Sequence, residues 1–430
     1  MQHKLSGLIL FLLCFSTVTL LGQKNVNSPY SRFNIGSLNP SGSFRSLSMG
    51  GTGVAMRDNN SVYFDNPASY SSVDTISFIF DFGVDYAKYQ LDNGTSKFST
   101  SDLNFNHLLM AFPVSKRIGI ATGLVPLSNG YYYLTQSIKS GDPNYDPITG
   151  EVNFIHQGSG SLSKYFLGTG IRVIKNLSVG INMNVIFGEL TRLNQFEFVD
   201  YTNSYNQNGK ENLRINGINF DYGLQYSARI KKNYFVTAGF SYTPRSNLSS
   251  SLTKLTTRFT AYNFTSNDTL SYTYSHPNDS TKFPASFKTG ISFGKTDKFV
   301  VEVDYAYTKW AEGMIHGMDS SLANTSAWMF GIEFIPDKYS NSSFLNRVEY
   351  RLGGHISDNY LRLKGVQLKE YGVSCGLGFS MRKTLSKATI FFDYTRRVGD
   401  LTRGLHNENI YSAGISLNLY ERWFLKRKYE

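Results

Sequence analysis

Long apolar runs, cysteine and metal-ligand patterns are scarce in this sequence, and each shortage narrows the possible architectures. After residue 22, no stretch of the 430 residues approaches the roughly eighteen consecutive apolar residues of a transmembrane helix. The mean hydropathy of −0.27 also argues against a bundle of membrane helices, for which it would be positive. The two cysteines are Cys14, within an apolar N-terminal run, and Cys375, so no internal disulfide is expected in a mature exported chain.

Catalytic, metal-binding and phosphate-binding patterns are missing as well. The seven histidines are scattered and never have a metal-ligand spacing such as His-Glu-x-x-His. The glycines at 50, 51 and 53 lack the Lys-Ser or Lys-Thr that completes a phosphate-binding loop. Residues 372–376 match the Gly-x-Ser-x-Gly nucleophile elbow by letter, but they lie in an alternating strand and not in a strand-to-helix turn. We therefore expect no enzyme, no metal site and no cofactor.

An export signal accounts for the one long apolar run. Lys4 supplies the positive end, residues 5–21 are apolar, and Gly22 is a small residue at the expected cleavage point. Residues 1–22 are therefore predicted to be a signal peptide, and the mature chain to begin at Gln23. The chain is basic, with a formal net charge of +11. For an exported chain we expect outer-membrane lipid and lipopolysaccharide as neighbours, and no nucleic acid.

Aromatic residues and period-two alternation are abundant. The chain has 29 Tyr and 32 Phe, while only 17% of its residues are charged. In the clearest run, residues 177–187, apolar side chains alternate with serine, glycine and asparagine, with Ile186 as the exception. Such a pattern places apolar side chains on one face of a strand and polar side chains on the other.

About fourteen such runs follow one another. They lie near 76–86, 102–113, 117–126, 161–174, 177–193, 213–230, 233–244, 284–294, 298–309, 326–336, 346–354, 368–381, 387–398 and 409–423. Most have the roughly ten residues that a tilted outer-membrane strand needs, and short and long connections alternate between them. The sequence thus predicts an all-β fold: a transmembrane antiparallel barrel of about 14 strands in the outer membrane of a Gram-negative bacterium. An even strand number would leave both termini in the periplasm. Trp310, Trp328 and Trp423 fall at strand ends, where barrels carry aromatic girdles.

A glycine-rich stretch, residues 49–69, precedes the first strand and has no sustained strand or helix period. Gly50, Gly51 and Gly53 permit tight turns or close backbone approach. Asp58 opens one turn-forming cluster, and Asn66-Pro67-Ala68 lies in a second. Two interpretations stay open: a compact element packed against something larger, or a surface loop before the first strand.

This stretch resembles the N-terminal hatch of the FadL-type outer-membrane proteins, through Gly50, Gly51, Gly53, Asp58, Asn66, Pro67 and Ala68. The segment Ser-Pro-Tyr-Ser-Arg-Phe at residues 28–33 is similar to a group of such proteins from the Bacteroidota. The resemblance implies a monomeric barrel with a plug, and in many members the passage of hydrophobic molecules. The expected domains are a hatch inside the barrel at 23–72, the barrel at 73–424 and a basic C-terminal tail at 425–430. The alternation of residues 411–419 also resembles the signal by which the barrel-assembly machinery recognises its clients.

The polar faces of the runs are predicted to carry charges of both signs into the lumen. The expected lumen charges are Lys164, Arg172, Asp221, Arg229, Lys288, Glu302, Asp304, Arg347, Glu349 and Arg351, with Asp81, Asp85, Glu333, Glu370 and Asp393 on the same faces. Charges in a narrow barrel stay ionised only if they are paired or hydrated. This pattern suits a plugged barrel and departs from the apolar route expected of a fatty-acid channel.

One lateral opening is predicted near the end of the third strand, at Gly123 and Pro126. Proline cannot donate to a strand ladder. In FadL-like proteins a kink in the third strand opens a window towards lipid. The alternative is that Pro126 simply ends the strand at the outer rim.

Two functions remain open from the sequence. The first is passive passage of small hydrophobic molecules through a hatch and a lateral opening. The second is a non-transporting accessory subunit of a larger outer-membrane machine, such as those of type 9 secretion or barrel assembly. The polar lumen favours the second, while the hatch motif fits both.

Overall fold

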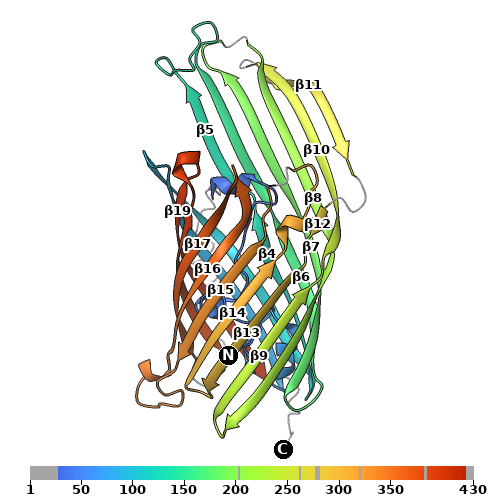
Figure 1. The fold of residues 1–430 in the computed structure, drawn as a ribbon, viewed down its shortest axis with the longest axis vertical. Coiled ribbons are helices and arrows are strands. Elements are labelled where there is room, and N and C mark those ends of the chain that lie inside the picture. The colour runs from blue at the N-terminus through green and yellow to red at the C-terminus, as the bar shows by residue number, and fades with distance from the viewer. Residues whose placement is uncertain are drawn as a thin grey trace, which may run out of the picture.

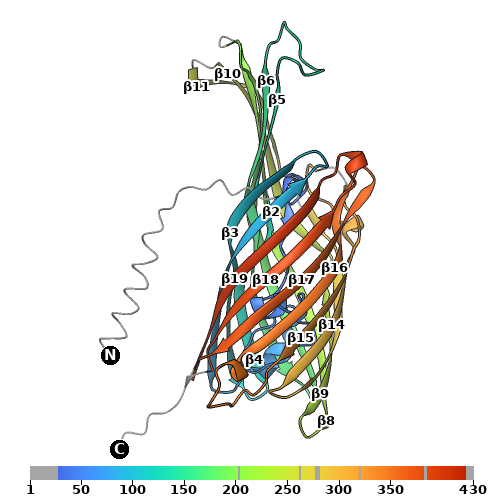
Figure 2. The ribbon, with the colours of Figure 1, turned by 90° about the vertical axis from the view of Figure 1, so that its left-hand side faces the viewer.

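The computed structural model describes residues 28–422, except for 202–203, 261–262, 277–280, 319–320 and 382–384. In this part of the chain, fourteen antiparallel strands close into a barrel (Figures 1 and 2). The barrel strands are β2 (Ser77–Asp92), β3 (Lys97–Ser115), β4 (Ile118–Asn129), β6 (Val152–Arg172), β7 (Leu177–Phe198), β8 (Asn206–Lys231), β9 (Tyr234–Thr243), β13 (Ser286–Lys295), β14 (Phe299–Thr308), β15 (Thr325–Phe334), β16 (Glu349–Leu363), β17 (Val366–Ser380), β18 (Lys387–Val398) and β19 (Asn407–Arg422). The barrel closes where β19 pairs with β2, from Asn407↔Asp92 to Arg422↔Ser77. Each of the fourteen runs predicted from alternation corresponds to one of these strands, so the predicted fold class is confirmed.

The alternation sorts side chains between the outside and the lumen as predicted. On β7 the side chain of Ile181 is 37% exposed, whereas that of Asn182 is 1% exposed. Cys375 on β17 is free and exposed on the outer face, beside the buried Ser374. An apolar outer face and a closed ladder of backbone hydrogen bonds are the two conditions that a lipid environment sets for strands.

A wall of strands extends beyond the barrel on one side (Figure 1). It consists of β5 (Tyr132–Ile138), β10 (Ser246–Thr260), β11 (Asn263–Ser275), the short β12 (Thr281–Phe283) and the outer halves of β6, β7 and β8. β10 pairs with β8 from Ser249↔Asn216 to Phe259↔Asn206 and carries β11 on its other edge. Residues 127–160 and 245–283 fall between the predicted runs and were expected to be two of the long connections without strands, which was wrong. In these segments both faces of the sheet lie beyond the apolar belt, so the alternation that marks a lipid-facing strand is lost.

The N-terminal segment, defined as residues 28–73, lies within the barrel (Figures 1 and 2, in blue). It contains the short helices η1 (Pro29–Arg32), α2 (Phe44–Leu47) and η2 (Pro67–Ser72) and the two-residue strand β1 (Ser37–Leu38). Its apolar residues are almost fully buried, for example Phe44 and Met49 at 0% and Tyr70 at 1% exposed. No helix among the described residues is long and apolar enough to span a membrane.

The tryptophans only partly follow the prediction of an aromatic girdle. Trp328 is 49% exposed on the outer face and packs against Tyr305, with ring centroids 4.8 Å apart. Trp310 is not on the outer face. It starts the helix η3 (Trp310–Glu312), is 7% exposed and packs on Tyr360 with ring centroids 5.1 Å apart. The prediction was wrong here because the chain leaves the strand after Thr308 and turns Trp310 inward. Trp423 lies outside the described residues.

The two ends of the described chain lie at opposite ends of the barrel. The Ser28 hydroxyl donates to Glu408 at the start of β19, whereas Arg422 ends that strand at the other rim. The predicted signal peptide at 1–22, the predicted mature start at Gln23 and the basic tail at 425–430 lie outside the described residues. The position of the two termini therefore stays a prediction.

Arginine at Ile181 should destabilise the barrel by about 2–4 kcal/mol, since this outward side chain lies in the apolar belt. The matched control is Thr191→Arg, on the same face of β7 but in the wall, where we expect little change. Asn182 is no neutral comparison, because its amide donates to the Phe64 carbonyl at 3.2 Å. Urea unfolding followed by heat-modifiable gel mobility measures both costs. Equal costs at the two positions would contradict the position of the belt.

Candidate functional site: the lumen and the N-terminal segment

The glycine loop of the N-terminal segment lies directly against the barrel wall. Gly50 has a φ of +73°, and a Cβ placed there would come within 2.5 Å of the Gly354 carbonyl oxygen on β16. The Gly50 N–H donates to the Ser374 hydroxyl on β17 at 2.9 Å. Gly50 is therefore required both for the turn and for the close backbone approach. Ser374, the centre of the Gly-x-Ser-x-Gly match, thus lies within a strand and holds this loop.

Two carboxylates of β14 bind the backbone that follows this loop. Asp304 Oδ2 accepts from the Gly53 and Val54 N–H groups at 2.8 and 3.0 Å, and Glu302 Oε1 accepts from the Ala55 N–H at 2.7 Å. Both carboxylates are 1% exposed. Each of these three hydrogen bonds satisfies a backbone donor that is buried away from water, so together they fix the loop to one place on the barrel strands.

A buried ion network forms the second anchor. Arg45 in α2 donates through Nη2 to Glu333 Oε1 at 2.7 Å and also pairs with Asp58. On the barrel strands β15 and β16, Arg351 Nε binds Glu333 at 2.7 Å, and Arg351 also pairs with Glu349. Lys387 binds Glu349 at 2.7 Å, and the four side chains on the barrel strands are each at most 7% exposed. The network on β15, β16 and β18 thus also holds Arg45, and through it Asp58, of the N-terminal segment.

The electrostatics of Asp58 reflect this network. Burial alone would raise the pKa of the Asp58 carboxyl, but the Arg45 guanidinium more than offsets this and holds the pKa well below its ordinary value. Asp65 behaves in the same way: burial raises its pKa, but the Lys288 ammonium outweighs this and the pKa is lowered. Both carboxylates are therefore kept ionised by cations that they contact inside the barrel.

The Asn-Pro-Ala motif forms a third anchor. The Asn66 amide donates to the Val54 carbonyl at 2.8 Å and to the Leu224 carbonyl of β8 at 3.1 Å. Its side-chain oxygen accepts from the Ala68 N–H at 3.2 Å and caps η2, with Pro67 at the first position. All seven predicted hatch residues lie in the N-terminal segment. Asp58 and Asn66 contribute side-chain contacts, and Gly50 and Gly53 donate backbone N–H groups to the barrel strands.

Most of the predicted lumen charges do face the lumen. Lys288 pairs with Asp65, Lys164 lies 5.6 Å from the Phe64 ring centre, and the Arg172 guanidinium donates to the Ser71 carbonyl at 2.9 Å. The Asp221 carboxylate on β8 accepts a hydrogen bond from the Asn184 amide on the neighbouring strand β7 at 2.8 Å. Arg229 lies on the lumen-facing side of β8 but is exposed near its end.

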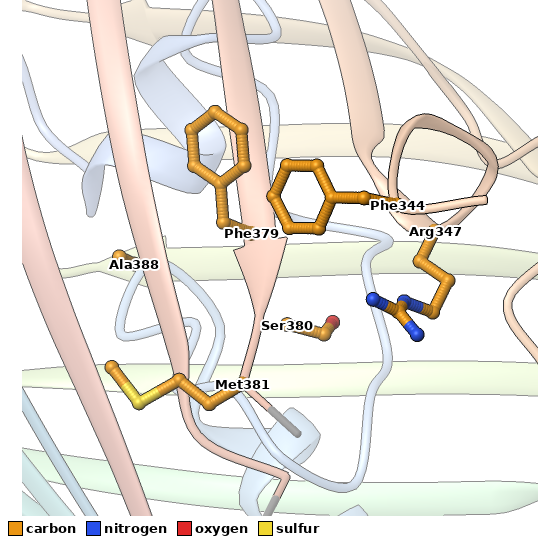
Figure 3. A pocket seen from close by; sticks show the side chains of 6 residues that line it. All are labelled: Phe344, Arg347, Phe379, Ser380, Met381 and Ala388. Atoms are coloured by element: carbon orange, nitrogen blue, oxygen red, sulfur yellow. The ribbon is translucent and has the colours of Figure 1, made fainter. Parts of the chain in front are cut away.

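Arg347 was predicted to face the lumen, and this prediction was wrong. It lies in the helix η4 (Leu345–Arg347), outside the barrel at the rim with the short turns. Its guanidinium donates to the Ser340 carbonyl and lies over the Phe344 ring. There it lines an open pocket of about 590 Å³ with Phe344, Phe379, Ser380, Met381 and Ala388 (Figure 3). The error arose because the strand begins at Glu349 and not at 346, so the alternation does not extend to Arg347.

A third cluster of charges was missed by the sequence analysis. Arg397 on β18 binds Glu370 at 2.8 Å and Glu408 at 2.6 Å, and its guanidinium also reaches the Ser28 hydroxyl at 3.2 Å. Arg192 on β7 donates to the Arg32 carbonyl at 3.0 Å. The signal was present, since Arg397 lies an even number of residues after the predicted lumen residue Asp393. These contacts fix the first described residues at the outer end of the lumen.

The predicted lateral opening coincides with the end of a ladder. The β3–β4 pairing stops at Leu108↔Leu124, between Gly123 and Pro126. Beyond it, β4 pairs on that edge with β1 of the N-terminal segment, at Ser128 and Asn129. Gly123 itself is tightly packed, since an added Cβ would lie 2.7 Å from the Leu108 carbonyl oxygen. The N-terminal segment thus contributes a strand at the place where β3 and β4 separate.

In the part of the chain that the structure describes, no group of three or more His, Cys, Asp or Glu side chains could hold a metal ion. The chemistry that the lumen residues can perform is binding. They hold 28–73 through charge-assisted hydrogen bonds.

Replacing Arg45 with Met should lower the free energy of unfolding by about 3–5 kcal/mol, because Asp58 would be left buried without its cation and Glu333 would keep Arg351 alone. The expected companion effect is a higher ion conductance in planar bilayers. Arg214→Met is the control: Arg214 pairs with Glu189 at 2.8 Å on the exposed wall, and such a pair contributes at most about 1 kcal/mol. Unchanged conductance and stability in the Arg45 variant would contradict the anchoring role.

Acidification should loosen the N-terminal segment. The pKa of Asp58 is depressed in the folded state, so its stabilisation is present above the unfolded pKa of about 3.9 and is lost as pH falls towards the folded value. Hydrogen exchange of residues 45–65 should therefore accelerate between pH 5 and pH 3 beyond the intrinsic change. Asp58→Asn should show a smaller pH response, and an unchanged response would contradict this assignment.

Comparison with solved structures gives the same architecture. The monoaromatic hydrocarbon channel CymD superposes with a TM-score of 0.59 at 14% identity, covering 92% of this chain and 99% of that one. A FadL homologue of Pseudomonas aeruginosa gives 0.58 at 12% identity, covering 90% and 99%. The toluene transporter TodX of Pseudomonas putida gives 0.56 at 13% identity, covering 87% and 96%. At these identities the likeness shows the fold alone.

No curated protein matches the sequence. The family comparison, in contrast, covers the chain completely: the BamG family matches over residues 1–430. Because the match spans the whole sequence, the protein belongs to the BamG family.

Proposed function

We propose that this protein is a non-transporting accessory subunit of a larger outer-membrane assembly, with residues 28–73 acting as a permanent plug. The observation that carries the proposal is the way the lumen charges are used. Lumen-facing side chains on β14, β15 and β18 bind the N-terminal segment, through Asp304, Glu302, Glu333 and Arg397. A mobile hatch would have to break all of these buried contacts together, at a cost of several kcal/mol.

The wall of strands that projects beyond the barrel supports the same proposal. A barrel that only conducts small molecules has no need of strands that continue far outside the lipid. Here β7 and β8 have 22 and 26 residues, compared with the roughly ten needed to cross the membrane. β11 pairs with β10 alone among the described strands and ends the wall as an edge. An exposed edge and two solvent-facing sides give a neighbouring protein a large contact surface. Membership of the BamG family, which is not named for transport, fits this role.

Passage of hydrophobic molecules is the second candidate. It is favoured by the fold shared with hydrocarbon channels and by the end of the β3–β4 ladder at Leu108↔Leu124. In this alternative, molecules would leave the lumen sideways above Gly123. The polar contacts below that point argue against a route across the whole barrel, so any passage would use the outer half alone.

Purification from native membranes in mild detergent should recover the protein in a fixed ratio with other outer-membrane proteins. Replacing residues 253–274 by a two-residue turn would end the β10–β11 hairpin at the Leu252↔Ser275 pair and remove most of the wall edge. We expect this variant to assemble, judged by heat-modifiable mobility, but to lose its partners. Replacing residues 140–150, at the tip of the β5–β6 connection, is the matched control.

Uptake of an apolar fluorescent probe distinguishes the two candidates. In the accessory role, uptake is the same with wild-type protein and with the shortened wall, while recovery of partners differs. Recovery of the wild-type protein as a lone barrel, together with uptake that falls in its absence, would overturn the proposal in favour of transport.

A further inference from the structure

One part of the barrel surface opposite the wall shows a repeated order of residues across four adjacent strands. β17, β18, β19 and β2 lie side by side and face the viewer in Figure 2. Each carries an exposed tyrosine on its outer face: Tyr371, Tyr394, Tyr411 and Tyr86. Two residues further towards the long connections, the same face carries Lys369, Arg396, Asn409 and Lys88. Two residues in the other direction, it carries the small or apolar Val373, Phe392, Ala413 and Val84.

The strand register places these residues in one band. Tyr371 lies opposite Arg396, Tyr394 opposite Tyr411, and Tyr411 opposite Lys88. Neighbouring strands are about 4.8 Å apart, so the three cations fall within roughly 15–20 Å of one another. The order from apolar to tyrosine to cation follows the profile of a membrane leaflet, from acyl chains through the interface to headgroup phosphates.

The three cations have no ionic partner among the residues that the structure describes. Lys88, Lys369 and Arg396 are exposed and form no ion pair with any residue that the structure describes. The nearby carboxylates have other partners: Asp92 pairs with Lys97, Asp400 pairs with Arg403, and Asp358 accepts from Ser326. Three uncompensated cations in one band attract anions, and an extended hydrocarbon surface lies directly below them.

The opposite side of the barrel lacks this order. On β7 the outer face passes from the exposed Phe187 to Glu189, which pairs with Arg214, and then continues into the wall. A lipid headgroup would meet an acidic residue there and not a free cation. The two sides of the barrel therefore offer different surfaces to the outer leaflet.

We infer that Lys88, Lys369 and Arg396, with the tyrosines below them, form a binding site for the phosphorylated headgroup of an outer-leaflet glycolipid, that is, lipopolysaccharide. The long connections and the wall place this band at the outer end of the barrel, where lipopolysaccharide forms the leaflet. The acyl chains would lie along Val84, Val373 and Phe392, and the phosphates would bind the cations. This inference does not depend on the function proposed above, since either role needs a barrel seated in lipid.

The test compares two triple variants of equal charge change. Lys88→Glu, Lys369→Glu and Arg396→Glu together reverse the band. Lys116→Glu, Arg117→Glu and Lys175→Glu reverse three exposed cations of the short turns at the other end of the barrel. Each protein is purified in mild detergent and titrated with lipopolysaccharide, with phosphatidylglycerol and with inorganic phosphate, and the bound lipid is counted by native mass spectrometry. Heat-modifiable mobility checks that each barrel is folded.

We expect the wild-type protein and the short-turn variant to retain lipopolysaccharide, and the band variant to bind it at least about tenfold more weakly. If the glutamate variant does not fold, the same three positions are changed to Gln, for which a smaller loss in the same direction is expected. The inference is overturned if the folded band variant binds lipopolysaccharide like the wild type. It is equally overturned if the short-turn variant loses as much, or if phosphatidylglycerol binds the band as tightly as lipopolysaccharide.

Discussion

The charged interior of this barrel depends on one constraint: a charge held away from bulk water must have a partner. Glu333, Glu349 and Arg351 are each at most 4% exposed and lie on strands whose other face meets lipid. They cannot escape to solvent without breaking the ladder, so they pair with one another and with Lys387 on β18. The N-terminal segment adds Arg45 as a second partner of Glu333, and donates backbone N–H groups to Glu302 and Asp304. Barrel closure thus brings these polar side chains together in the lumen, and the burial of residues 28–73 gives them further partners there.

The same constraint separates this lumen from that of an apolar channel. A channel for hydrophobic molecules needs a surface that such molecules can wet, and a hatch that moves at small cost. Here charged side chains of the barrel strands make buried contacts with the N-terminal segment at both ends of the lumen. Arg397 and Glu408 hold Ser28 near the outer end, while Glu333 holds Arg45 deeper in the barrel. The fold of the hydrocarbon channels is kept, but its interior is used for a different kind of contact.

Outside the lumen, the barrel divides into two sides. On one side the strands end near the membrane surface with a tyrosine followed by a cation, as on β18 at Tyr394 and Arg396. On the other, β6, β7 and β8 continue beyond the barrel as a sheet. A single chain thus offers one surface suited to lipid headgroups and one suited to protein contact.

The sequence by itself determined the fourteen membrane strands and their inward and outward faces, but left open whether the glycine-rich stretch before them is a compact element or a surface loop. These features depend on local periodicity, which lipid enforces residue by residue: Ile181 faces outward and Asn182 inward because neighbouring side chains must alternate. Only the tertiary structure decided the rest. The wall was missed because apolar side chains recur only at intervals there, as at Leu248 and Leu252 on β10, between runs of serine and threonine. Arg347 and Trp310 were misplaced because each lies just beyond the end of a strand, where alternation no longer applies. The pairing of Arg45 with Glu333, 288 residues apart in the chain, depends on barrel closure and register, and no local pattern encodes it.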